Sequence, residues 1–175
     1  EGLAEDDLVV HIRSGDVFGP FPHRRYGQPP LSFYQKVIAS RDWGSITIVA
    51  EDHANPVIAG LQTLLDDRSE VRFFIGRTLE EDMALLLSAK TLVTSVGTFC
   101  RAICALSHHL ETVFVFNGRF HHWGNRSVRT VNCIDVCGTY ARSLMESNWV
   151  NSDWQRMRML HYPESNLVLM KGGKR

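Results

Sequence analysis

The chain has 175 residues, of which 44% are hydrophobic, which suits one compact domain and is too few residues for two domains of ordinary size. Its 19 basic and 19 acidic residues cancel, which excludes a broad positive field that would draw the protein onto nucleic acid or an anionic membrane. No stretch approaches the roughly 18 consecutive apolar residues that span a bilayer, so we expect no membrane contact from this segment.

The first predicted element is an apolar strand over residues 8–12, which ends in the sequence His-Ile-Arg-Ser-Gly-Asp at 11–16. Strand side chains alternate between faces, so His11 and Arg13 point the same way while their apolar neighbours pack. The strand follows almost directly on an acidic start, residues 1–7, which does not suit a signal peptide. We therefore expect the chain to be a piece of a longer protein.

The end of this strand predicts an anion site. Open α/β sheets bind ligands outside the carboxyl ends of their strands, which is where Arg13 falls. Its guanidinium offers five donors in a planar fork that suits two phosphate oxygens, and Gly15 allows a sharp turn beside an anion. The local pattern is typical of a phosphate-binding turn.

Strands and helices then alternate along the chain. A loop over 17–30, interrupted by glycine and proline, is followed by a helix over 31–40 that starts at Pro30. Thr78 predicts a helix start with Glu81 in the capping-box position, and the apolar content of that helix predicts deep burial. The remaining predicted elements are strands over 46–50, 71–75, 91–95 and 112–116 and helices over 55–65 and 97–106.

Five strands alternating with four helices predict an α/β fold, a Rossmann-like doubly wound parallel sheet whose core spans residues 8–117 of a single domain over 1–175. The alternation stops after residue 117. A last helix is expected after Ser152, with Val150, Trp154, Met157 and His161 as the stripe that packs on the domain or on a neighbour outside the chain. Residues 171–175 are expected to fray.

A second anion-binding element is predicted where the fourth strand ends. The helix that follows Ser95, Gly97 and Thr98 points its N-terminus at the same sheet edge as Arg13. Helix N-termini present free N–H groups and the positive end of the helix dipole. Taken alone, Ser95 and Thr98 fit a simple capping role, whereas their pairing with Arg13 favours anion binding.

These residues carry a resemblance to a known family. The sequence at 11–16 resembles the His-x-Arg-x-Gly-Asp motif of the GDP-fucose-using fucosyltransferases, which include the α1,2-, α1,6- and protein O-fucosyltransferases. Residues 82–89 and 92–99 are similar to a later motif of the same enzymes. The resemblance covers about residues 8–106 and implies the C-terminal, donor-binding half of a GT-B glycosyltransferase, without its N-terminal acceptor-side domain.

The resemblance also implies roles for individual residues. Arg13 would hold the β-phosphate, Thr98 with Gly97 and Ser95 would hold phosphate oxygens, and His11 and Asp82 would face guanine. A carboxylate can accept two hydrogen bonds from the N1–H and N2–H₂ edge of guanine, which adenine lacks. The implied donor substrate is GDP-fucose, and the implied acceptor is a hydroxyl of a glycan or glycoprotein.

Glycosyl transfer from a nucleoside diphosphate places charge on the β-phosphate as the sugar departs. Arg13 and the helix N-terminus can stabilise this charge without a metal. The chain has no Asp-x-Asp sequence, so we predict no metal site, no cofactor and no requirement for a divalent cation. Asp16 is a candidate general base or a carboxylate that orients Arg13, with the missing domain as the other source of the base. Glu51 and Asp52 fit either ribose contact or loop capping.

Several other residue groups leave alternatives open. The loop at 23–26, His-Arg-Arg-Tyr, could close over a ligand or form a solvated surface loop. Cys100 and Cys104 read as buried small hydrophobic residues. His121, His122, Cys133 and Cys137 are residue types that bind zinc, but their spacing matches no standard arrangement. Asn-Arg-Ser at 125–127 matches a glycosylation sequon.

Three functions remain open on the sequence. The first is a metal-independent fucosyltransferase-like enzyme, and the second is a non-catalytic nucleotide-sugar or carbohydrate-binding module with the same fold. The third is an unrelated Rossmann-like domain, which the absence of Gly-x-Gly-x-x-Gly and Walker A sequences disfavours. The compartment is the Golgi lumen for a eukaryotic source or the cytosol for a bacterial one.

Overall fold

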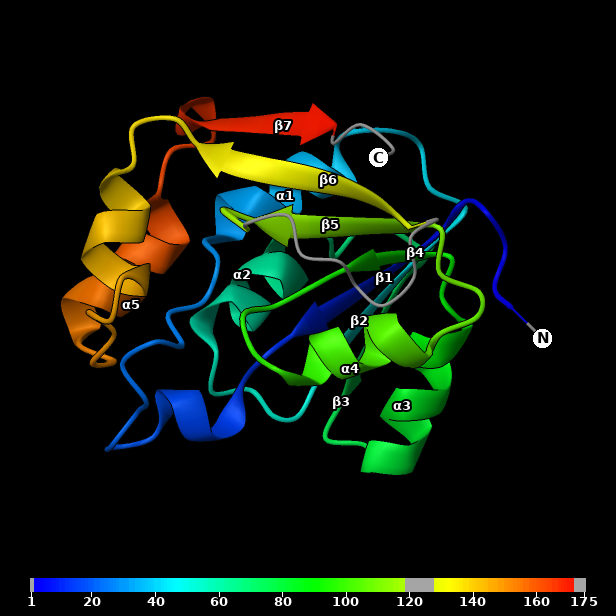
Figure 1. The fold of residues 1–175 in the computed structure, drawn as a ribbon, viewed down its shortest axis with the longest axis horizontal. Helices are drawn as coiled ribbons and strands as arrows, with labels where there is room; N and C mark the ends of the chain where they lie inside the picture. Colours follow the sequence, from blue (N-terminus) through cyan, green and yellow to red (C-terminus); the bar gives the residue numbers. More distant parts are fainter. Residues whose placement is uncertain (1, 119–127, 172–175) are drawn as a thin grey trace.

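A computed structural model describes residues 2–118 and 128–171, which form a seven-stranded sheet in the order β3-β2-β1-β4-β5-β6-β7 (Figure 1). The strands are β1 (Asp7–Ile12), β2 (Ser45–Ala50), β3 (Val71–Ile75), β4 (Thr91–Val93), β5 (Thr112–Phe116), β6 (Arg129–Asp135) and β7 (Leu167–Lys171). β1 to β6 run parallel, and β7 pairs antiparallel with β6. The strand order reverses between the neighbours β1 and β4, which is where open α/β sheets bind ligands.

Helices cover both faces of the sheet (Figure 1). One face carries α1 (Leu31–Ile38), α2 (Pro56–Leu64) and α5 (Asp153–His161), and the other carries α3 (Leu79–Ser88) and α4 (Phe99–Leu106). Three short helical turns complete the described elements: η1 (Gly15–Phe18), η2 (Ala141–Met145) and η3 (Glu164–Asn166). None of the helices in this part of the chain is long and apolar enough to cross a membrane.

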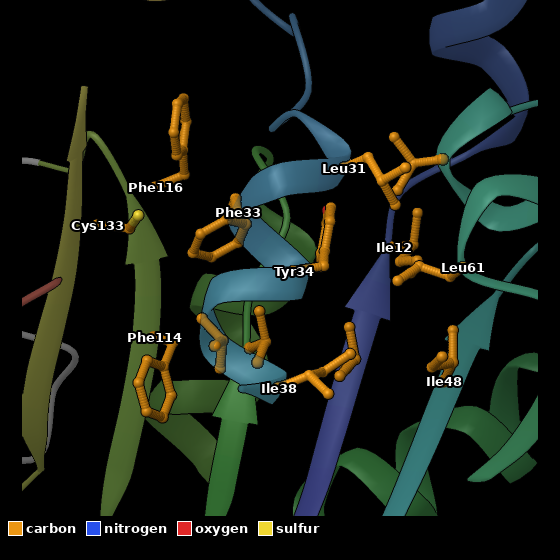
Figure 2. Packing of buried hydrophobic residues seen from close by; sticks show 14 of the residues in the cluster. Ile12, Leu31, Phe33, Tyr34, Ile38, Ile48, Leu61, Phe114, Phe116 and Cys133 are labelled. Carbon is orange, nitrogen blue, oxygen red and sulfur yellow. The ribbon is translucent and has the colours of Figure 1, made fainter. Parts of the chain in front are cut away.

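The larger core cluster lies between the sheet and α1, where the helix buries two adjacent aromatic side chains (Figure 2). Phe33 and Tyr34 are almost completely buried, and the Phe33 ring centroid lies 5.5 Å from that of Phe116 on β5. Trp43 packs at the C-terminal end of α1 and donates from Nε1 to the Ile38 carbonyl at 3.0 Å. Buried aromatic side chains contribute large apolar area, so this packing fixes α1 against the central strands.

The structure confirms the predicted α/β class, and β1 to β5 lie in the segments of the chain where strands were predicted. The strands Val71–Ile75 and Thr112–Phe116 begin and end at the predicted residues. Asn55 caps α2, and the predicted capping box at the start of α3 forms between Thr78 and Glu81. Local sequence patterns predicted these elements correctly because the residues that form each strand or cap lie close together in the chain.

The prediction of five strands is wrong by two, because β6 and β7 extend the sheet in the region after residue 117, where the alternation was expected to stop. β6 buries polar side chains, which breaks the apolar pattern of a core strand. The Asn132 side chain is satisfied by the backbone of Gly118, with bonds of 3.1 and 2.6 Å. Asp135 accepts a 2.6 Å bond from the Tyr162 hydroxyl. These partners are distant in sequence, so the strand has no local signature.

The expected deep burial of α3 is wrong, and of the two alternatives for the stripe around α5, packing on the domain is wrong while packing on a neighbour outside the chain stays a prediction. Within α3 only Asp82 and Leu86 are buried, because a single stripe of the helix contacts the rest of the domain. The predicted packing stripe around α5 is exposed: Trp154 is 58% and Met157 is 53% exposed. α5 does pack back on the domain, against α1 and α2, but the residues that it buries are Gln155 and Met159.

Candidate functional site

A cavity of about 460 Å³ lies at the carboxyl ends of β1 and β4, the position predicted for ligand binding. It brings together residues from β1, the turn after β1, the end of β2, α3 and the β4–α4 loop. The polar and glycine residues along its wall are His11, Arg13, Ser14, Asp16, Glu51, Arg77, Asp82, Ser95 and Gly97. The guanidinium and the start of α4 thus meet in one cavity, although the two segments are far apart in sequence.

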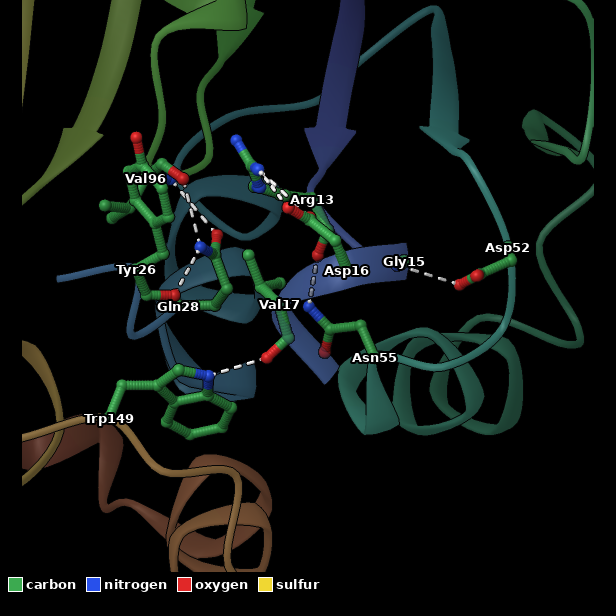
Figure 3. Close-up of polar contacts among 10 residues, drawn as sticks. All are labelled: Arg13, Gly15, Asp16, Val17, Tyr26, Gln28, Asp52, Asn55, Val96 and Trp149. Carbon is green, nitrogen blue, oxygen red and sulfur yellow. Dashed lines mark hydrogen bonds and ion pairs between the residues drawn. The ribbon is translucent and has the colours of Figure 1, made fainter. Parts of the chain in front are cut away.

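The turn after β1 is fixed by a hydrogen-bond network with the end of β2 (Figure 3). The Ser14 hydroxyl and the Gly15 amide both donate to Asp52, the latter at 3.1 Å. The Asn55 amide donates to Ser14 Oγ at 2.9 Å, and Asn55 Nδ2 donates to the Arg13 carbonyl at 2.9 Å. The backbone of residues 13–15 is therefore held by side chains from the neighbouring strand and the α2 cap.

Asp52 takes the loop-capping role, one of the two alternatives for the strand-end carboxylates. Burial opposes its ionisation, but hydrogen bonds from Ser14, Ala54 and Gly15 lower the pKa of the carboxyl. Gly15 has a φ of 63°, and a Cβ there would collide with the Glu51 carboxylate. Gly15 thus shapes the turn, while its N–H is engaged by Asp52.

Arg13 is surrounded on three sides. Its Nη2 donates to both oxygens of Asp16, at 3.0 and 3.2 Å, and its guanidinium carbon lies 4.7 Å from the centroid of the Tyr26 ring. A Cβ on Gly97 would lie only 2.7 Å from Nη1, so the glycine permits the close approach of the two segments. Among the described residues, the buried Nε has no hydrogen-bond acceptor. Asp16 is in the position of a residue that orients Arg13.

The β4–α4 loop brings Ser95 and Gly97 to the cavity wall but not Thr98. Thr98 is the N-cap of α4, is exposed and makes no side-chain capping bond. The first intrahelical bond runs from the Ala102 amide to the Thr98 carbonyl at 3.1 Å. The amides of the first turn precede that bond and face the N-terminal end of the helix, as in any α-helix.

His11 lies beneath this loop, with Nδ1 2.7 Å from Ser95 Oγ and 3.1 Å from Cys100 Sγ. Burial, helped by the charge of Arg13, lowers the pKa of His11 to about 4, so the ring is neutral at pH 7. Burial raises the pKa of Cys100 to about 11. The cysteine therefore remains a thiol, and the pair contributes hydrogen bonding rather than charge.

Asp82 reaches the cavity from α3 and is only 9% exposed. Its Oδ1 has no hydrogen-bond partner among residues 2–118 and 128–171, and the nearest cation, Arg77 Nε, lies 3.9 Å away. Burial raises the pKa of Asp82, although Arg77 opposes the shift. Buried polar atoms are nearly always hydrogen-bonded, so an orphan carboxylate oxygen at a cavity wall indicates a place for a ligand donor or an ordered water.

Tyr26 was predicted only as part of a loop that could close over a ligand or form a solvated surface loop, and no role was predicted for Gln28. Both lie in the loop that the family motifs leave uncovered. Tyr26 packs on Arg13, whereas the preceding residues His23, Arg24 and Arg25 are exposed. Gln28 is fully buried beneath the site. The pairing of a basic strand end with an aromatic residue in the next loop was a signal for Tyr26, but no local pattern marks a buried glutamine.

Some of the His and Cys residues considered as zinc-binding types, in a chain for which no metal site was predicted, lie outside the described residues. Residues 2–118 and 128–171 contain no group of three His, Cys, Asp or Glu side chains that could hold a metal ion. His121, His122 and the sequon at 125–127 lie outside this range, as do residues 172–175 of the tail. Cys100, Cys104 and Cys133 are buried thiols, whereas Cys137 is exposed.

No family model and no curated protein matches the chain. A solved structure, that of ADP-heptose lps heptosyltransferase II from E. coli, is similar with a TM-score of 0.44 and 17% sequence identity. The match covers 73% of this chain and 39% of that one, so the chain corresponds to well under half the length of that enzyme.

Proposed function

We propose that this chain is the donor-binding domain of a metal-independent glycosyltransferase of the fucosyltransferase type. The observation that carries the proposal is the convergence of three groups on one cavity: the Arg13 guanidinium, Gly97 in the loop that leads into α4, and the Asp82 carboxylate, whose Oδ1 accepts no hydrogen bond from the described residues. The first two groups suit a diphosphate, and the third suits the hydrogen-bond donors of a nucleobase.

The diphosphate would lie between Arg13 and the first turn of α4. As the glycosidic bond breaks, its electron pair goes to the β-phosphate oxygen, and the new negative charge is met by a guanidinium and by amides that are already in place. Removing one such preorganised donor typically costs about 10²–10³ in rate. Two groups of this kind reduce the need for a metal ion, so we expect binding to withstand EDTA.

Asp82 supplies selectivity for the nucleobase, guanine over adenine. Its free Oδ1 can accept from the N1–H or N2–H₂ of guanine, an edge that adenine does not offer. Together with the motif at residues 11–16, this leads us to propose GDP-fucose as the donor. His11, bonded to Ser95, is proposed to line the base side of the same cavity.

The acceptor is proposed to be a hydroxyl of a glycan or glycoprotein, held by a domain that this chain does not contain. Asp16 is engaged with Arg13 through both carboxylate oxygens, so we assign it to orienting the guanidinium. The general base is then proposed to lie on the acceptor-side domain.

Calorimetric titration with GDP, GDP-fucose, UDP and ATP tests the proposal on the wild type and on Arg13→Ala. We expect guanine-selective binding that persists in EDTA and collapses in the variant. Arg41→Ala is the matched control, because Arg41 also stacks on an aromatic ring, 3.9 Å above Trp43, and lies outside the cavity.

Equal binding of all four nucleotides would reject the role of Asp82, and equal losses in the two variants would reject the role of Arg13. Sugar transfer by a longer protein that contains this chain then separates the enzyme from a non-catalytic nucleotide-sugar-binding module. Binding without transfer would favour the module.

A further inference from the structure

The side-chain amide of Gln28 joins two segments that are distant in the chain. Gln28 is 0% exposed and lies in the loop between η1 and α1. Its Nε2 donates to the carbonyls of Tyr26, at 2.8 Å, and Val96, at 3.0 Å, and its Oε1 accepts from the Val96 amide at 3.1 Å (Figure 3). The side-chain amide thus forms hydrogen bonds with both the carbonyl and the amide of Val96, a residue 68 positions away.

Both segments that Gln28 joins are in contact with Arg13. The Tyr26 ring lies 4.7 Å from the guanidinium carbon. Val96 precedes Gly97, whose backbone approaches Arg13 Nη1 so closely that a Cβ there would lie 2.7 Å from it. The glutamine itself does not line the cavity. It therefore acts on the guanidinium only through the residues that it holds.

The Gln28 loop is in turn fixed from the C-terminal part of the chain. The Tyr140 hydroxyl donates to the Gln28 carbonyl at 2.7 Å. A Cβ on Gly27 would collide with the Leu144 carbonyl, so the loop lies directly against η2. Trp149 Nε1 donates to the Val17 carbonyl at 2.7 Å, which anchors η1, the turn that precedes the same loop. The backbone that carries the Gln28 side chain is therefore held in place by contacts with the C-terminal part of the chain.

We propose that Gln28 is a positioning residue that holds the Arg13 guanidinium in place for an incoming diphosphate. This inference rests on the proposed donor-binding function of the cavity. An arginine side chain has large rotamer entropy, and ordering it before binding removes that cost from the binding step. Gln28 would order it by setting the distance between the Tyr26 ring and the Gly97 backbone.

The test uses Gln28→Leu, with Gln155→Leu as the matched control. Gln155 is 3% exposed and is also a cross-linking amide, which donates to the Asn148 carbonyl at 2.7 Å and accepts from the Val150 amide at 3.0 Å. It lines no part of the cavity. Both variants lose buried hydrogen bonds and some stability, but only Gln28→Leu is expected to alter the surroundings of Arg13.

Two readouts are needed. The first is the ¹⁵N relaxation of the Arg13 Nε–Hε group in the ligand-free protein, assigned by the loss of its signal in Arg13→Ala. The second is the affinity for GDP. We expect Gln28→Leu to increase the motion of the Arg13 group and to weaken GDP binding about three- to tenfold, the loss that corresponds to ordering one long side chain during binding. In the Arg13→Ala background it should add no further loss.

Wild-type motion of Arg13 and wild-type GDP affinity in Gln28→Leu would overturn the inference, and so would equal effects in Gln155→Leu. If the wild type fails to bind GDP, the proposed function fails, while greater Arg13 motion in Gln28→Leu alone would still support the positioning role. If Gln28→Leu does not fold, Gln28→Glu replaces it. That variant keeps the acceptor for the Val96 amide and loses both donated bonds.

Discussion

Replacing Asp82 with leucine is expected to stabilise the protein and to weaken GDP binding. Asp82 is 9% exposed, and its Oδ1 has no hydrogen-bond partner among the described residues. Leaving a buried polar atom unsatisfied costs about 1–3 kcal/mol. Leucine would remove that cost, at the expense of a long ion pair with Arg77 and of one acidic residue in the first turn of α3.

The magnitudes favour a net gain in stability. An ion pair near the surface contributes at most about 1 kcal/mol, and an acid near a helix N-terminus about 0.3–1 kcal/mol. We therefore expect Asp82→Leu to raise the free energy of unfolding by about 1 kcal/mol, or Tm by about 2–4 °C for a chain of this size. Loss of two charge-assisted hydrogen bonds to guanine should weaken GDP binding by about 3 kcal/mol, which is roughly a hundredfold.

Thermal unfolding and GDP titration measure the two effects. Glu80→Leu is the control, because Glu80 is an exposed acid in the same helical turn, and its removal loses only the helix-dipole term. The gain in stability should shrink in acid: because burial raises the folded-state pKa of Asp82 above its unfolded value, the destabilisation by its charge is absent below the unfolded pKa, grows as pH rises above it and is complete above the folded-state pKa. If Asp82→Leu proved less stable than Glu80→Leu and bound GDP normally, Asp82 would have neither the energetic cost nor the binding role assigned to it.

Three further outcomes follow from the geometry. Gly97→Ala should weaken GDP binding by about tenfold or more, measured by calorimetry, because the methyl group would meet Arg13 Nη1 at 2.7 Å; unchanged affinity would mean that the two segments move apart freely. His11 has a lowered pKa of about 4, so the stability that its neutral ring gives should be lost as pH falls from about 6.5 towards 4. NMR titration of the ring checks this, with His11→Gln as the control for acid unfolding. An ordinary histidine pKa would contradict it. GDP affinity should be the same in EDTA and in Mg²⁺, and a dependence on Mg²⁺ would argue for a metal in the site.

The parts of the fold that could be predicted are those specified by neighbouring residues. The strands Val71–Ile75 and Thr112–Phe116 are rich in β-branched and aromatic residues. The capping box at Thr78 needs only residues within one helical turn. β6 was missed because its buried Asn132 is satisfied by Gly118, a partner that only the folded chain brings near. Polar residues in a strand read as a break unless such partners are known.

The same distinction applies to the site. The residue pattern at 11–16 and the start of α4 predicted two groups at one sheet edge, and the fold brings Arg13 and Gly97 together there. The packing of Tyr26 on Arg13 and the bonds of Gln28 to Val96 depend on long-range contacts. Sequence therefore identified the groups suited to a ligand, but not the residues that hold those groups in place.

Arg13 and the first turn of α4 are proposed to bind one diphosphate together. The most direct measurement is a titration of ¹⁵N-labelled protein with GDP, observed at the Arg13 Nε–Hε group and at the backbone amides of Gly97, Phe99 and Cys100. We expect all four signals to shift and to saturate at the same GDP concentration. Shifts confined to another part of the protein, or shifts of Arg13 without those of α4, would contradict it.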